Sequence, residues 1–269
     1  MASYSQLVVA DSPLFYWKMN ETSGTELAAT VGSTPITLGT LTAKPTLGVA
    51  GADAALGTAV QFDGTNDIAS AAIDLSARSA VVLEFWLYWD AYAPNDDMAL
   101  EYGVGGASLV AGFYVDPNFS VDGTFAASIG TGGDTGKITR PSAAAWHHYA
   151  ISLDRAQAGG AEVVYMVVDG VSASITHVAG ANAGNFSNLT LTLMHRGDGS
   201  LFGAGRMQHL AIYSSLSLAN AQAHYAARAN EPSGGGGDDW TSPMRTPDRT
   251  PDSTPQDRLR ILRNPGRRQ

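Results

Sequence analysis

The chain of 269 residues contains no cysteine. A disulfide framework and a thiolate metal site are therefore excluded. Long apolar runs are also missing, because no stretch approaches the ~20 uncharged apolar residues that a membrane-spanning helix needs. The first residues, Met1 to Ser5, lack a basic segment followed by an apolar one, so the sequence predicts no secretory signal peptide.

Lysine is scarce, and the 25 acidic residues outnumber the 16 basic ones, which gives a net charge of −9. An acidic chain is a poor general binder of nucleic acid. The charge is unevenly distributed, since residues 230–269 hold seven arginines and six acidic residues. The negative charge therefore lies in residues 1–229, and the change in composition at Asn230 predicts a domain boundary there.

The segment after this boundary has the composition of a linker and a tail. Residues 230–240 are rich in glycine and predict a flexible linker. In residues 241–269, a proline recurs at every fourth position from Pro243 to Pro255, which favours an extended, polyproline-like conformation. The segment has too few apolar residues to fold alone, so we expect it to dock on a partner as a strap. Its candidate docking residues are Arg245, Arg249, Arg258, Arg260, Ile261, Leu262, Arg263, Arg267 and Arg268.

Short strands account for most of residues 1–229. The run 81–89 is β-branched and aromatic, with apolar groups on both faces, which is typical of a strand covered on both sides. Asp169-Gly170 separates the runs 163–168 and 171–178 and predicts a hairpin. One helix is predicted, capped by Ser217 and continuing to Arg228. Further strands are expected at residues 146–153, 189–194 and 207–213. This pattern indicates a β-sandwich.

Three segments occur in a fixed order along the chain. They are residues 11–24, then residues 60–64 with 83–87, and then residues 146–149 through 168–170 to 205–213, closing at 216–217 and 224–225. Together they resemble the laminin G-like branch of the concanavalin A-like lectin/glucanase superfamily, over roughly residues 4–228. The resemblance implies an all-β, two-sheet antiparallel jelly-roll sandwich with one short C-terminal helix. Relatives carry acidic residues where this chain has Gln208 and His209, which puts any calcium or structural polar role there in doubt.

The acidic residues do not have the spacing of a glycosidase. Glycosidases of this superfamily place their carboxylates on one strand as Glu-x-Asp-x-x-Glu, and a retaining enzyme needs two of them about 5–5.5 Å apart. Here Glu84 and Asp90 are six positions apart and separated by apolar and aromatic residues. We therefore predict no catalytic residue and no enzymatic activity. A hydrolase on the same fold is the alternative that this spacing disfavours.

Two groups of residues suggest a metal at first sight. His147 and His148 are neighbours on a predicted strand, so they point to opposite faces and do not easily chelate one ion. The residues of 63–67 place oxygen ligands close together, but a turn between strands is the preferred interpretation. We predict no metal site and no cofactor, and a structural calcium ion remains the open alternative at residues 63–67.

Several aromatic residues border predicted loops that are rich in Asp, Asn and Gly. An aromatic ring beside carboxylate and amide groups suits sugar binding, because the ring stacks on C–H faces while the polar groups contact hydroxyls. The alternative for each ring is that it plugs one end of the sandwich. The candidate carbohydrate-binding residues are Trp89, Tyr92, Asp96, Asp97 and Tyr102.

Laminin G-like jelly rolls of this kind are common in bacteriophage tail proteins. The resemblance therefore implies a non-enzymatic virion structural protein, a minor tail or capsid-decoration component, which is made in the host cytoplasm and anchored through its C-terminal tail. Its expected partners are other virion structural proteins, host cell-surface glycans and further copies in a homo-oligomer, but neither a membrane nor sequence-specific nucleic acid. The alternative is a carbohydrate-binding module or adhesin that recognises cell-surface glycans.

Overall fold

The computed structural model describes residues 1–92, 97–105, 111–119, 123–130, 133–157, 159–178, 180 and 182–230. Asp96, the docking residues of the tail and all but the first residue of the expected linker lie outside these ranges. Their roles therefore stay predictions. Within the described ranges, no helix is long and apolar enough to cross a membrane.

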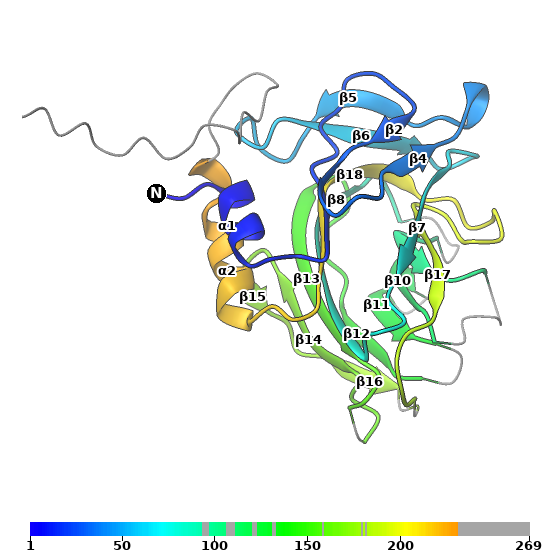
Figure 1. Ribbon diagram of the computed structural model, residues 1–269, viewed down its shortest axis with the longest axis vertical. Helices are drawn as coiled ribbons and strands as arrows, with labels where there is room; N and C mark the ends of the chain where they lie inside the picture. Colours follow the sequence, from blue (N-terminus) through cyan, green and yellow to red (C-terminus); the bar gives the residue numbers. More distant parts are fainter. Residues whose placement is uncertain are drawn as a thin grey trace, which may run out of the picture. The chain divides into compact units, whose positions relative to one another are not determined.

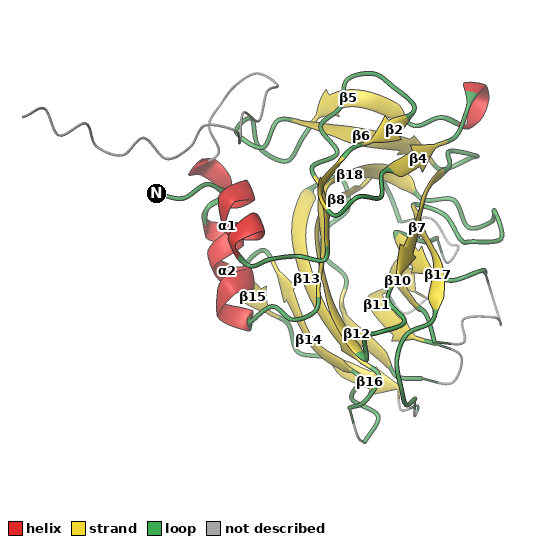
Figure 2. Ribbon diagram, in the orientation of Figure 1, coloured by secondary structure: helices red, strands yellow, loops and turns green. Residues whose placement is uncertain are grey.

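The described strands form two nine-stranded sheets that face each other, and all pairs of named strands are antiparallel (Figures 1 and 2). Sheet A contains β1 (Phe15–Trp17), β3 (Ala29–Val31), β5 (Thr46–Ala50), β6 (Thr58–Asp63), β8 (Ala80–Trp89), β13 (Trp146–Asp154), β14 (Val163–Val168), β15 (Val171–Ser172) and β18 (Ala204–Tyr213). Sheet B contains β2 (Glu26–Leu27), β4 (Ile36–Leu38), β7 (Ala69–Asp74), β9 (Leu100–Tyr102), β10 (Phe113–Phe119), β11 (Thr124–Ile129), β12 (Thr135–Thr139), β16 (Thr176–Val178) and β17 (Asn188–Leu193). The all-β sandwich expected from the sequence is confirmed.

Two hydrophobic clusters lie on the two sides of sheet A. The larger one fills the space between the sheets and takes Leu83, Phe85 and Leu87 from alternate positions of β8. The smaller one contains Trp86 from the opposite face of β8 and lies under two helices, α1 (Tyr4–Ala10) and α2 (Leu218–Ala226) (Figure 2). Both faces of β8 are therefore covered, as its apolar sequence predicted.

The two α-helices are each capped by a serine. The predicted helix α2 begins after Ser217, whose side chain accepts a hydrogen bond from Asn220 N at 3.1 Å. It ends at Ala226, and a short 3-10 turn, η3 (Arg228–Asn230), follows; a second such turn is η1 (Leu41–Ala43). Helix α1 was not predicted, although Ser3 and Gln6 form a capping box, which is a sequence signal for a helix start.

The segment 171–178 differs from the prediction of a single strand. The turn itself is confirmed, because Asp169 and Gly170 both have positive φ, as a tight hairpin turn requires. Beyond it, β15 pairs with β14 in sheet A, whereas β16 pairs with β12 in sheet B. Residues 173–175 carry the chain from one sheet to the other, with Ala173 and Ile175 packed against the larger core cluster. The apolar pattern of this run thus reflects a crossing of the core edge and not one continuous strand.

Candidate functional site

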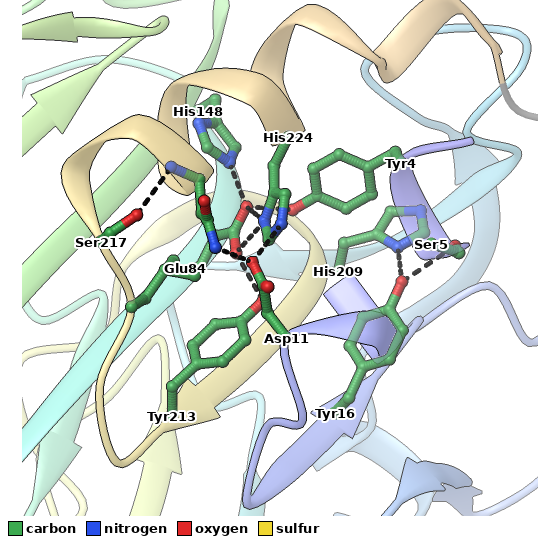
Figure 3. A network of polar contacts seen from close by, with 12 residues as sticks. Tyr4, Ser5, Asp11, Tyr16, Glu84, His148, His209, Tyr213, Ser217 and His224 are labelled. Atoms are coloured by element: carbon green, nitrogen blue, oxygen red, sulfur yellow. Dashed lines mark hydrogen bonds and ion pairs between the residues drawn. The ribbon is translucent and has the colours of Figure 1, made fainter. Parts of the chain in front are cut away.

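A buried carboxylate lies at the centre of the helix-covered face of sheet A. Glu84, in the middle of β8, has no exposed surface and points toward the two helices (Figure 3). Its oxygen atoms accept hydrogen bonds from the hydroxyls of Tyr4 on α1 at 3.1 Å and Tyr213 on β18 at 2.6 Å. They also contact His148 Nε2 on β13 at 2.8 Å and His224 Nδ1 on α2 at 3.0 Å. Four elements therefore converge on one side chain.

A second carboxylate completes this cluster. Asp11, which follows α1, lies 3.0 Å from His224 Nε2 and accepts a hydrogen bond from Asn220 Nδ2 at 2.8 Å. Both ring nitrogens of His224 thus contact carboxylates, Asp11 on one side and Glu84 on the other. Burial alone would lower the pKa of His224, but the hydrogen bonds and charges of the two carboxylates raise it above its ordinary value.

The same contacts keep Glu84 ionised. Burial would raise the pKa of its carboxyl group, but hydrogen bonds from His148 and His224 outweigh burial and hold the pKa well below its usual range. Burial, together with the charge of Glu84, raises the pKa of Tyr4 and of Tyr213 well above 10.0, so both hydroxyls remain donors. The cluster is thus a buried ion pair enclosed by hydrogen bonds.

A neighbouring group on the same face involves Gln208 and His209. The Gln208 amide donates to the carbonyl oxygens of Leu56 and Thr58, at 2.7 Å each. His209 Nδ1 lies 2.6 Å from the Tyr16 hydroxyl (Figure 3). The sequence put a structural polar role at these positions in doubt. The structure corrects this, because the Gln208 amide and the His209 imidazole both make buried polar contacts.

The Glu84 cluster holds both helices against sheet A and is largely buried. Apart from Asp11, whose side chain is 25% exposed, the titratable groups of the cluster are buried. Because these groups are buried against one another, the arrangement ties α1 and α2 to sheet A. From the sequence, Glu84 was considered as a catalytic candidate, and its buried contacts were not predicted. An acidic residue inside the apolar run 81–89 was the available signal of a buried, partnered carboxylate.

The predicted carbohydrate-binding residues lie in two different environments. Trp89 and Tyr102 are 3% and 0% exposed and belong to the core between the sheets. Tyr92 and Asp97 are partly exposed. The Tyr92 hydroxyl donates to Pro141 O at 2.9 Å, and the Arg140 guanidinium lies 3.8 Å from its ring centre. The plugging alternative therefore describes Trp89 and Tyr102, whose ring faces are closed to a ligand.

The residues considered for metal binding have other partners. His147 Nδ1 lies 2.7 Å from Asp169, whereas His148 contacts Glu84, so the two imidazoles point apart. Asp63 accepts a hydrogen bond from Thr65 N at 2.8 Å, as expected of a turn. Across the described ranges, no three His, Asp or Glu side chains come together in a group suited to a metal ion.

The outer face of sheet B carries a row of hydrogen-bonding side chains. Six residues occupy directly opposite positions on β7, β17, β9, β10, β11 and β12, and we call them the sheet B row: Ser70, Thr192, Glu101, Tyr114, Ser128 and Thr135. The Ser128 and Thr135 hydroxyls are 2.9 Å apart. Tyr114 is partly exposed, and burial of the rest of its side chain raises its pKa. Ser70, Tyr114 and Thr135 are partly exposed, whereas Thr192, Glu101 and Ser128 are buried, so the row presents two hydroxyl side chains and one aromatic ring.

Comparison with known protein families gives one match. A laminin G family model, described as the concanavalin A-like lectin/glucanases superfamily, matches residues 62–221. A search of curated proteins found no match.

Solved structures share the fold at low sequence identity. A sialidase from Trypanosoma rangeli, in complex with the inhibitor DANA, has a TM-score of 0.55 at 10% identity, over 79% of this chain and 32% of the sialidase. Domain 4 of AbnA, a GH43 extracellular arabinanase from Geobacillus stearothermophilus, in complex with arabinotriose, has a TM-score of 0.54 at 14% identity, over 79% of this chain and 98% of that domain. The binding domain of Paraclostridial Mosquitocidal Protein 1 has a TM-score of 0.54 at 14% identity, over 82% of this chain and 52% of the binding domain's chain. The chain spans about a third of the sialidase, and these likenesses show the fold alone.

Proposed function

The chain belongs to the concanavalin A-like lectin/glucanases superfamily, and we propose that it is a non-enzymatic, lectin-like module that binds cell-surface glycans at the outer face of sheet B. The observation that carries this proposal is the sheet B row. The partly exposed hydroxyls of Ser70 and Thr135 can donate to and accept from sugar hydroxyls, and the partly exposed Tyr114 ring can stack on a sugar C–H face.

The burial of Glu84 and Glu101 favours ligand binding without catalytic turnover. Glu84 is enclosed by its four partners, and Glu101 in the sheet B row has no exposed surface. Glu101 accepts hydrogen bonds from Gly105 N at 2.8 Å and Gly197 N at 3.0 Å and pairs with Arg196. A glycosidase needs two carboxyl groups that reach the scissile bond, and these two are committed to the protein itself.

A short neutral saccharide is the first ligand to test. The arabinanase domain with the same fold was solved with arabinotriose, which supports a saccharide as the ligand class. We expect the full chain to bind arabinotriose or another glycan on an array, and Tyr114→Ala to weaken that binding by about ten-fold or more. The matched control is Thr190→Ala, on the same face of β17 but outside the row.

Two measurements decide this proposal. Calorimetric titration of the wild type and both variants reports affinity, and thermal unfolding verifies that Tyr114→Ala still folds. Equal affinity of Tyr114→Ala and wild type contradicts the site, and an array without any bound glycan contradicts the function. Release of reducing sugar from a bound polysaccharide contradicts the non-enzymatic part of the proposal.

A second candidate role concerns the whole chain. We propose that it is a bacteriophage virion component, a minor tail or capsid-decoration protein, that displays the sandwich and attaches through residues 241–269. The supporting observation is the sequence of that segment, in which prolines recur and seven arginines accumulate after Asn230. An extended proline-rich segment can cover much surface, and arginine pairs well with carboxylates or phosphates on a partner.

Assembly experiments test this role. A chain ending at Asn230 should fold but fail to join the particle, because the proposed attachment is removed. A full-length variant with the seven arginines replaced by glutamine separates charge from chain length, and we expect it to attach weakly. Normal incorporation of the shortened chain into purified particles would contradict the proposed role of the tail.

A further inference from the structure

A second row of side chains crosses the outer face of sheet A. Residues in directly opposite positions on β5, β6, β18, β8 and β13 form what we call the sheet A row: Thr46, Gln61, Arg206, Tyr88 and Trp146. Thr46 is exposed, and the other four are partly exposed. Neighbouring strands are about 4.8 Å apart, so the four steps of this row span about 19 Å.

The helices leave this row open. The row two residues back along β8 contains Gln208, Trp86 and His148, and all three are at most 3% exposed. Trp86 stacks on Tyr225 of α2 with ring centres 5.8 Å apart. Both helices pack against this part of sheet A (Figure 1). Two residues further along β8, Tyr88 and its neighbours Arg206 and Trp146 are not fully covered by the helices and remain partly exposed.

The aromatic and charged members of the row contact one another. The rings of Tyr88 and Trp146 meet edge to face, with centres 5.7 Å apart and planes at 65°. The Arg206 guanidinium carbon lies 4.6 Å from the centre of the Tyr88 ring. Arg206 Nε is buried and has no hydrogen-bond acceptor, and no ion pair joins Arg206 to a described residue. The Arg206 side chain as a whole is partly exposed, and the terminal nitrogens of its guanidinium can donate to an oxygen supplied by a ligand.

We propose that the sheet A row is a separate saccharide-binding site that takes a neutral oligosaccharide. The Tyr88 and Trp146 rings stack on C–H faces of the sugar, and the Arg206 guanidinium and the Gln61 amide donate hydrogen bonds to its oxygen atoms. A span of about 19 Å accommodates more than one sugar ring. A neutral chain is favoured over an acidic one because negative charge predominates in residues 1–229.

This site is independent of the proposed function of sheet B. The two rows lie on the outer faces of different sheets and share no residue, so either can bind without the other. It also differs from the aromatic residues that the sequence singled out. Trp89 and Tyr102 face the core, whereas Tyr88 and Trp146 face outward.

Tryptophan fluorescence tests the site in the full chain. Trp17, Trp86 and Trp89 are at most 3% exposed, so a Trp240→Phe background makes Trp146 the partly exposed reporter. The probes are arabinotriose, cellohexaose and mannohexaose as neutral saccharides and trigalacturonate as the acidic one. We expect at least one neutral probe to shift the emission and to protect it from acrylamide quenching.

Variants assign the signal to the row. Arg206→Gln leaves both core clusters intact, and we expect it to weaken binding about ten-fold, as should Tyr88→Ala. Val164→Ala, an exposed position of sheet A outside the row, is the matched control and should bind like the wild type. Tyr114→Ala should retain the signal, because that residue belongs to the sheet B row.

Four results would overturn the proposal. They are an unchanged emission with every neutral probe, wild-type affinity in Arg206→Gln, a stronger response to trigalacturonate than to all neutral probes, and loss of the signal in Tyr114→Ala. The last result would place the ligand on sheet B and leave the proposed function standing. Conversely, a Trp146 signal with no effect of Tyr114→Ala on any glycan would support this site and contradict the other.

Discussion

Glu84 holds a negative charge where water does not reach, and the four side chains around it make this possible. An isolated buried carboxylate would become protonated, since burial raises its pKa. Here two imidazoles and two phenols contact its oxygen atoms, and the pKa is lowered instead. Because those partners come from α1, β13, β18 and α2, one side chain connects both terminal helices to sheet A.

Replacing this carboxylate should destabilise the fold strongly. We expect Glu84→Gln to lower the free energy of unfolding by about 3–5 kcal/mol, because it leaves two buried imidazoles and two phenols without their charged partner. Urea denaturation measures the change. Glu26→Gln, on an exposed strand position, is the matched control and should change stability by less than about 0.5 kcal/mol. Similar losses in both variants would contradict the role of the cluster.

The raised pKa of His224 gives stability a definite pH dependence. A group with a higher pKa in the folded chain stabilises fully below its unfolded pKa of about 6.5 and loses this contribution as pH rises through the folded value. We therefore expect the free energy of unfolding to fall as pH rises above about 6.5. In His224→Gln this part of the pH dependence should vanish, which denaturation series at several pH values will measure. An unchanged slope in the variant argues against a charged His224.

The elements that cover sheet A depend on local sequence signals and on close contacts. Ser3 and Ser217 cap the two helices, and Gln222 Nε2 of α2 donates to Gly170 O in the β14–β15 turn at 3.0 Å. The helix and the turn approach so closely that a Cβ atom built on Gly170 would lie 2.7 Å from Tyr225 Cδ1. Glycine at this position therefore serves both the turn and the packing of the helix.

Two glycine substitutions separate these effects. Gly170→Ala should destabilise by about 2–3 kcal/mol, because it combines a positive φ of 75° with a clash against Tyr225. Gly184→Ala is the control, with a φ of 77° and nothing within 4 Å of the added atom, and should cost about 1 kcal/mol. Thermal and urea unfolding of both variants measure the difference. Equal costs would show that the contact with α2 adds nothing.

At the scale of the whole molecule, the residues that bury the described core end before the predicted linker. Among the described residues, which end at Asn230, the last buried member of the two hydrophobic clusters is Ala221, and the last buried hydrophobic residue is Ala227. We therefore expect these contacts to hold the fold without the segment after Asn230. If the domain boundary lies at Asn230 as predicted, the free energy of unfolding should not depend on the residues after it.

Removing the tail should leave stability unchanged. We expect a chain of residues 1–230 to unfold within about 0.5 kcal/mol of the full chain, because it retains all described residues of both core clusters. Scanning calorimetry of the two chains, combined with limited proteolysis of the full chain, measures this. A lower midpoint for the shortened chain would show that residues 231–269 contribute to the folded core.

The sequence alone determined the features that follow from local rules. The alternation of residues 81–89 predicted a strand covered on both faces, Asp169-Gly170 predicted the hairpin turn, and Ser217 predicted the start of α2. Each of these depends on residues adjacent in the chain, so periodicity and turn chemistry suffice. The ordered segments also led to the correct superfamily and sandwich.

Only the tertiary structure decided which polar and aromatic residues meet. Tyr4, Glu84, His148 and His224 are far apart in sequence, and no period or spacing predicts their contact. The side of β8 that each aromatic residue occupies was foreseeable, but not that helices would cover Trp86 and leave Tyr88 open. The division of residues 171–178 between two sheets was likewise fixed by pairing with distant strands. Burial and strand pairing depend on contacts between segments that are far apart in the chain. The order of residues within one segment does not show which distant residues it will contact.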